Sequence, residues 1–303
     1  MAGMRDPLTE EPPPSRFDPE ELNIFEPTDV IDLTPPSVEW APSVVEKLQS
    51  GQLRPQLLIV ALSKVGINLI HNLSKKTIIG NIVLPGTSMP KTTSDPGAKD
   101  KACYLFSCEP DLAIVLVSVQ YMVPVERSSV WTKFLFKLFA AERVLVLEHT
   151  PIRHFRGKLS VDEPMLFVLN TDQQKLEDEK SAPVAPYYPS GSLVDGLAAA
   201  LLTHCQLRGL KGRLLLTWPE DDSGLVKMLV AILSNILKVV PQGANVDFVE
   251  AGEKMVAMWK LAMENYCNCG LRSLQLLEYL MCMRSVAIQP GQNLQLPILS
   301  RPS

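Results

Sequence analysis

The stretch SLVDGLAAALLTHCQLRGLKGRLLLTW, from Ser192 to Trp218, has the pattern of a helix that leads directly into a buried strand. Ser192 followed three residues later by Asp195 resembles a capping box at a helix start. A period of 3.6 residues then places five residues on one helix face: Val194, Leu197, Ala198, Leu201 and Cys205. Gly209 and Gly212 permit the turn that follows, and the apolar run 213–217 has the length of a strand. Such a helix-to-strand step is a unit of a layered α/β sheet.

Other apolar runs extend this pattern along the chain. Strands are predicted at 56–62, 112–119 and 144–147, and nearly unbroken apolar runs are typical of strands covered on both faces. Ser63 is the expected N-cap of the helix after the first strand, and a second helix is predicted at 126–141. Strands that alternate with helices indicate an α/β fold with a mostly parallel, covered sheet flanked by helices.

The domain organisation follows from composition. Residues 1–43 contain nine prolines and ten acidic residues against two arginines, so we expect a disordered acidic, proline-rich tail. Residues 44–288 are expected to form a single α/β domain, with long loops at about 86–101 and 170–191. Its C-terminal part, 247–286, has a helical pattern with a break at Gly270, and 289–303 are predicted to be a flexible tail.

Charge and hydropathy exclude several classes of protein. The net charge is −4, and the small surplus of basic residues outside the acidic tail is dispersed, which does not favour nucleic acid binding. The start lacks a signal-peptide pattern, and the longest apolar run, 225–240, contains two lysines, so we expect neither secretion nor a membrane span. The six cysteines are expected to be reduced thiols. We therefore expect a cytoplasmic protein, with the nucleus as a second compartment.

No motif in the sequence predicts catalytic, cofactor-binding or metal-binding residues. The turn after the first predicted strand offers Gly66 alone where a dinucleotide fingerprint needs three glycines, and neither a P-loop nor a G-x-S-x-G elbow occurs. His204 and Cys205 are helix neighbours that point in different directions, so a buried structural cysteine is the better interpretation. His149 and His154 lack a partnered carboxylate or cysteine motif. Three cysteines have poor spacing for zinc: Cys267, Cys269 and Cys282.

Two helices carry more apolar surface than one buried face requires. On the helix predicted at 225–240, polar residues occupy about a 100° arc, which leaves an apolar arc about twice as wide as usual. Either the helix is central, packed between the sheet and the C-terminal helices, or its second side is a subunit interface. Aromatic residues of the 126–141 helix also cannot share one face. The candidate partner interface therefore comprises Trp131, Phe134, Phe136, Leu225, Leu229, Ile232 and Ile236.

Four blocks in the same order resemble the first subunit of the heterodimeric proteasome assembly chaperones. They are QLLIVALSKVGINLIHNL (56–73), the segment from AIVLVSVQYMVP to WTKFLFKLF (113–139), PMLFVLNT (164–171), and LAAALLTHCQ with the strand that follows it. The resemblance implies a non-catalytic protein without a cofactor that pairs with proteasome assembly chaperone 2. The pair would bind proteasome α subunits, scaffold their seven-membered ring and prevent off-pathway association.

One family feature is missing from this sequence. Members can end in a hydrophobic-Tyr-X motif that enters pockets of the α ring, whereas this sequence ends in ILSRPS (298–303). We therefore expect such a tail to come from the second subunit. Two rival functions stay open: an enzyme of the nucleoside-phosphorylase type, which has a similar α/β architecture but needs an anion site, and an α/β interaction adaptor unrelated to proteasomes.

Overall fold

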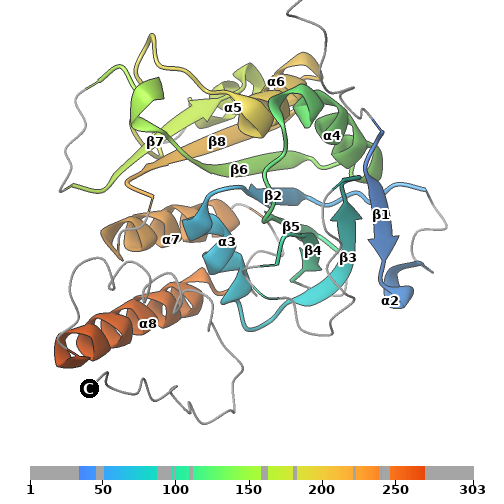
Figure 1. Cartoon of the computed structure of the whole chain (residues 1–303). Coiled ribbons are helices and arrows are strands. Elements are labelled where there is room, and N and C mark those ends of the chain that lie inside the picture. Colours follow the sequence, from blue (N-terminus) through green and yellow to red (C-terminus); the bar gives the residue numbers. More distant parts are fainter. Residues whose placement is uncertain are drawn as a thin grey trace, which may run out of the picture. The chain divides into compact units, whose positions relative to one another are not determined.

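An eight-stranded sheet with helices on both faces runs through the described part of the chain (Figure 1). The structure is a computed structural model that describes residues 34–45, 51–86, 97, 100–108, 112–157, 163–179, 183–220, 223–238, 240 and 246–269. The strand order is β1-β3-β4-β5-β2-β6-β8-β7. Within these residues, no helix is both long and apolar enough to cross a lipid bilayer.

The centre of the sheet consists of four parallel strands, which are the four that the apolar runs predict. In spatial order they are β5 (Ile114–Val119), β2 (Leu57–Ala61), β6 (Arg143–His149) and β8 (Lys211–Trp218). Their side chains alternate between two cores: Leu57 and Ile59 belong to one, and Leu58 and Val60 to the other. Burial on both faces explains why these runs are almost purely apolar.

The sheet as a whole is mixed, so the prediction of a mostly parallel sheet is wrong. Antiparallel pairing adds β4 (Cys103–Ser107), β3 (Thr77–Val83) and β1 (Ser37–Trp40) beside β5, and β7 (Met165–Asn170) beside β8. The physical reason is the length and content of the connections. Only residues 108–113 join β4 to β5, too few for the crossover that a parallel pair needs. In the described residues between β6 and β7, the helical structure is a 3-10 turn at Ile152–His154, which is too short for a crossover helix.

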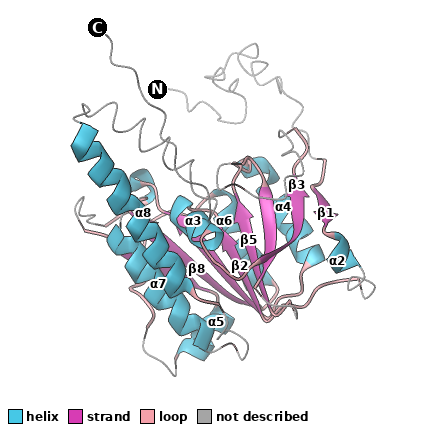
Figure 2. Ribbon diagram, turned by 90° about the horizontal axis from the view of Figure 1, so that it is seen from below, coloured by secondary structure: helices cyan, strands magenta, loops and turns pink. Residues whose placement is uncertain are grey.

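Each face of the sheet has its own layer of helices (Figure 2). One layer contains α3 (Lys64–His71), α7 (Ser223–Lys238) and α8 (Phe248–Cys269), and the other contains α4 (Val125–Leu138) and α6 (Gly196–Leu207). A close approach of α6 to β8 depends on Gly212, because a Cβ there would lie 2.8 Å from the Cβ of Cys205. Gly212 therefore serves packing, whereas Gly209, with φ of +62°, makes the turn.

The helix ends agree with the predictions in part. Ser63 caps α3 as predicted, since its hydroxyl accepts a hydrogen bond from the Gly66 N–H. The capping box at Ser192 is wrong: α6 begins only at Gly196, where a left-handed φ of +58° ends the extended segment, and the Ser192 hydroxyl instead accepts from the Arg156 N–H. The predicted buried face of this helix is confirmed for Leu197, Ala198, Leu201 and Cys205.

One of the two predicted loops contains regular structure. The loop predicted at 170–191 includes α5 (Asp172–Asp178), which starts because the Thr171 hydroxyl accepts from the Gln174 N–H. Most of the loop predicted at 86–101 lies outside the described residues. The helical prediction for 247–286 is confirmed as far as residue 269, and the break at Gly270 and the tail 289–303 lie outside the described part of the chain.

The N-terminal tail prediction is wrong for residues 34–43. Residues 37–40 form β1, which pairs with β3, and α2 (Pro42–Val45) follows it. Trp40 packs edge-to-face on Phe139 with ring centroids 6.1 Å apart, and a guanidinium nitrogen of Arg127 donates to the Thr34 carbonyl at 2.8 Å. Composition indicates disorder here because it does not register backbone pairing with a distant strand. Residues 1–33 lie outside the described residues.

Candidate functional site

The carboxyl ends of the parallel strands are the first place to look for chemistry, because ligands of open α/β sheets bind at that edge. Two pairs of side chains at this edge contact each other. The Lys64 ammonium lies 3.0 Å from a Glu220 carboxylate oxygen, and the His149 and Trp218 rings stack with centroids 5.9 Å apart. Ion pairing and stacking account for these residues without a substrate.

Glu148 near the end of β6 has the most perturbed carboxyl group of this edge. Burial raises its pKa to about 7, the hydrogen bond that Oε1 accepts from the His149 N–H at 2.7 Å opposes the shift, and the charges of Asp195 and Glu220 raise it further. The folded chain therefore holds a proton on Glu148 over a pH range in which the unfolded chain has released it.

Replacing Glu148 by Gln is expected to make stability less dependent on pH. Because the folded pKa lies above the ordinary value of 4.5, ionisation costs folding energy as pH rises from about 4.5 to 7. The free energy of unfolding of the unaltered chain should fall over that range. Relative to the unaltered chain, Glu148→Gln should be more stable at pH 8 than at pH 5, by on the order of 2 kcal/mol. Urea unfolding at pH 5 and pH 8 measures this difference. Parallel pH profiles for the two proteins would contradict it.

The described residues that we considered for catalysis or metal binding are buried in the core or contact other side chains of the chain. Cys205 is buried, and burial raises the pKa of its thiol to about 12, so almost no thiolate is present at neutral pH. His154 lies 3.6 Å from Asp195. Among the described residues, no three His, Cys, Asp or Glu side chains gather in a way that could hold a metal ion. The side chains of Cys267 and Cys269 and all of Cys282 lie outside the described residues.

Three of the seven predicted interface residues are buried inside the chain itself. Trp131, Leu225 and Leu229 are 0% exposed. The indole N–H of Trp131 donates to the Tyr121 hydroxyl at 3.0 Å, and α7 packs between the sheet and α8. Of the two interpretations of the 225–240 helix, the structure favours the central helix for Leu225 and Leu229.

The other four predicted interface residues are partly exposed, but they lie on opposite faces of the sheet. Phe134 and Phe136 belong to the layer of α4 and α6, whereas Ile232 and Ile236 belong to the layer of α7 and α8. The structure therefore does not bring them together into one surface. A partner contact for these four residues stays a prediction.

An exposed apolar set that the sequence reasoning missed lies at the carboxyl edge. We name it the apolar rim, and its four side chains are between 55 and 91% exposed: Met122, Val125, Ile152 and Leu193. The first two follow β5, Ile152 follows β6, and Leu193 precedes α6. The backbone N–H of Leu193 donates to the His154 carbonyl at 2.8 Å, which joins two of the loops. Isolated apolar residues in loops carry no periodic signal, so only the fold shows that they share an edge.

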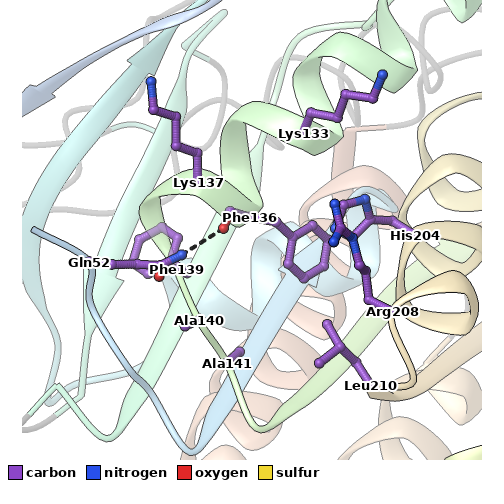
Figure 3. A pocket seen from close by; sticks show the side chains of 10 residues that line it. All are labelled: Gln52, Lys133, Phe136, Lys137, Phe139, Ala140, Ala141, His204, Arg208 and Leu210. Atoms are coloured by element: carbon purple, nitrogen blue, oxygen red, sulfur yellow. Dashed lines mark hydrogen bonds between the residues drawn. The ribbon is translucent and has the colours of Figure 1, made fainter.

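A pocket of about 630 Å³ opens at the opposite, amino edge of the parallel strands (Figure 3). We name it the basic pocket, and it is lined by Gln52, Lys133, Phe136, Lys137, Phe139, Ala140, Ala141, His204, Arg208 and Leu210. Its cationic side chains come from the C-terminal half of α4 and from the end of α6. Of the residues predicted for an interface, only Phe136 lines it, stacked on His204 with ring centroids 4.3 Å apart.

Solved structures with this arrangement of elements include archaeal homologues of proteasome-assembly chaperones. No protein-family model matches the chain, and no curated protein matches it in sequence. PbaA of Pyrococcus furiosus, an archaeal homologue of proteasome-assembly chaperone, is 15% identical, with 82% of this chain and 99% of PbaA covered and a TM-score of 0.52. PbaB of the same organism, an archaeal proteasome activator, is 15% identical over 76% of this chain and 98% of PbaB, with a TM-score of 0.50. These likenesses show a shared fold.

Proposed function

We propose that this chain is a non-catalytic assembly chaperone for the proteasome core particle. In this proposal it acts as a first subunit, of the proteasome assembly chaperone 1 type, pairs with proteasome assembly chaperone 2, and promotes assembly of the α-subunit ring in the cytoplasm or nucleus. The observation that carries the proposal is the likeness to PbaA, which extends over 99% of that chain. The sequence blocks that resemble the chaperone family lie within the same α/β unit.

The apolar rim is the surface that we assign to pairing with the second subunit. Large apolar side chains that are exposed together mark protein interfaces, because a partner can remove their surface from water. The rim contributes side chains from three loops on one edge of the sheet. Binding energy from such a surface would suffice for the proposed role, with no covalent chemistry.

Co-expression with the second chaperone tests both the pairing and the surface. We expect a one-to-one heterodimer by light scattering, and we expect α subunits to be retained from cell extract by the pair. Introducing carboxylates with Ile152→Asp and Leu193→Asp should prevent pairing, since an unpaired charge in an interface costs several kcal/mol. Leu176→Asp is the matched control, because Leu176 is also an exposed apolar residue but lies on α5 outside the rim.

Three results would contradict this assignment. A monodisperse chain that ignores the second chaperone would exclude the heterodimer, and a homo-oligomer that cleaves nucleosides with phosphate would support the rival enzyme. Loss of pairing in Leu176→Asp to the same extent as in the rim variant would show that the contact does not lie on the apolar rim.

A further inference from the structure

Three cationic side chains line the mouth of the basic pocket: Lys133, Lys137 and Arg208. Lys133 and Lys137 are four residues apart on α4, so both project from one side of that helix, and Arg208 follows the last turn of α6 (Figure 3). All three side chains belong to exposed residues. Packing of α4 on α6 brings together charges that are about 70 residues apart in sequence.

The carboxylates at the same edge of the sheet pair with other cations. Arg143 makes a two-pronged contact with Glu177 at 2.7 and 2.8 Å, and Lys211 lies 3.4 Å from Glu142. Within the part of the chain that the structure describes, Lys133, Lys137 and Arg208 make no ion pair. Cations near helix C-termini are favoured by the helix dipole, but only within the last turn, and Lys133 precedes the last turn of α4. The positive charge at the mouth of the basic pocket is therefore more than helix capping requires.

The pKa of His204 is affected by the same surplus of positive charge. Burial lowers the pKa of its imidazole, and the charges of Arg208 and Lys133 lower it further. Both cations thus act on one side chain, and no nearby carboxylate outweighs them there. The ring lies almost parallel to Phe136, at an interplanar angle of 13°, which keeps the imidazole at the wall of the pocket.

The pocket is formed before any partner arrives. The Gln52 side-chain amide donates to the Phe136 carbonyl at 2.8 Å, the Leu53 N–H donates to the Leu138 carbonyl at 3.0 Å, and the Ala140 N–H donates to the Leu53 carbonyl at 2.8 Å. These bonds attach the segment before β2 to the end of α4. The accessible apolar part of the lining is formed by Phe136, Ala140 and Leu210, whereas Phe139 and Ala141 are buried. A preformed pocket with an apolar floor and cations at its mouth can bind an apolar group flanked by negative charge.

We propose that the basic pocket binds a short acidic segment of a partner protein, with one apolar side chain on the floor and carboxylates against Lys133, Lys137 and Arg208. A peptide fits better than a nucleotide. Phosphate sites typically combine several backbone N–H groups at a helix N-terminus, whereas α4 and α6 both end at this pocket, so lysine and arginine side chains supply its positive charge beside an apolar lining. The proposal stands independently of the proteasome role, because it uses only the pocket and its charge.

The probe is a fluorescein-labelled peptide of sequence Glu-Glu-Phe-Glu-Asp, titrated with the full-length chain and followed by anisotropy in low salt. We expect saturable binding that weakens about tenfold in the double variant Lys133→Glu, Lys137→Glu, because two attractions become repulsions. The double variant Lys133→Arg, Lys137→Arg should bind as the unaltered chain does. The double variant Lys227→Glu, Lys238→Glu is the matched control for net charge, since both are exposed lysines on α7, away from the pocket.

Two further measurements distinguish this site from a general charge effect. Carboxylates bound beside His204 should raise the pKa of its imidazole in an NMR titration, and the peptide should leave His204 unaffected in the charge-reversed variant. Replacing the peptide's Phe by Ser should weaken binding, since the floor is then unused. The proposal is overturned by no binding to the unaltered chain, by equal binding to the charge-reversed variant, or by equally strong binding of the Ser peptide. Displacement of the peptide by ATP at equal concentration would also overturn it, in favour of a small-polyanion site.

Discussion

A carboxylate at position 229 is expected to abolish folding of this chain. Leu229 lies in the middle of α7, fully buried in the core that α7 forms with α3, α8 and the sheet. Burying an unpaired carboxylate there costs several kcal/mol, a large part of the 5–15 kcal/mol that stabilises a typical domain. Leu229→Asp should therefore yield insoluble protein, or protein whose urea midpoint falls sharply.

Met228→Asp is the matched control for that experiment. Met228 precedes Leu229 on the same helix but is 38% exposed, so its carboxylate can stay hydrated. We expect soluble protein with nearly unchanged stability. Equal behaviour of the two variants would mean that α7 does not pack between the sheet and α8 as described here.

Loss of Asp178 is expected to be the most damaging change to a charged residue. Arg213 on β8 is buried, and its guanidinium contacts both carboxylate oxygens of Asp178 while its Nε donates to the Asn170 side-chain oxygen at 3.2 Å. Asp178→Ala leaves that buried cation without a counter-charge, which costs about 3 kcal/mol in comparable pairs. Urea unfolding at neutral pH measures the loss.

Two comparisons make the Asp178 result specific. Combining Asp178→Leu with Arg213→Met should recover much of the lost stability, because an apolar pair avoids the cost of a buried charge. Asp172→Ala removes a carboxylate from the start of the same helix, where the residue is exposed and paired with Lys175, so we expect a much smaller effect. If Asp178→Ala costs no more than Asp172→Ala, Arg213 has found another partner and the described pair does not hold β8 to α5.

The two proposed surfaces lie at opposite ends of one helix layer. α4 and α6 both begin at the carboxyl edge, beside the apolar rim, and end at the amino edge, beside the basic pocket. A helix as long as α6 spans about 18 Å, so two partners could engage the layer without competing for the same residues. An assembly chaperone under our proposal would pair through the rim and leave the pocket for a different contact.

The sequence by itself determined the elements that are buried on two sides. The central strands β5, β2, β6 and β8 are apolar runs because each face of each strand meets a core, and this requirement is visible residue by residue. The buried face of α6, with Cys205 at its end, follows from a period of 3.6 residues in the same way. The interpretation of Cys205 as a structural cysteine depended on its position on that face, and Cys205 is buried in the structure.

Only the tertiary structure decided which elements became neighbours. β1 lies in a segment whose composition indicates disorder, and β3 approaches it closely at Gly80, where a Cβ would lie 2.8 Å from the Glu39 carbonyl oxygen of β1. The apolar pattern of β1 is weak, and both strands are held by backbone hydrogen bonds to residues far away in sequence. Antiparallel pairing, and with it the mixed sheet, could not be predicted from local patterns.

The candidate sites show the same division. Surplus apolar surface on the 225–240 helix is a property of the sequence, but whether α8 or another protein covers it depends on packing, and at Leu225 and Leu229 the cover is internal. Lys133 and Arg208 are ordinary surface residues when read in sequence, because a single charge on a helix carries no sign of its distant neighbours. They line one pocket only because α4 packs on α6.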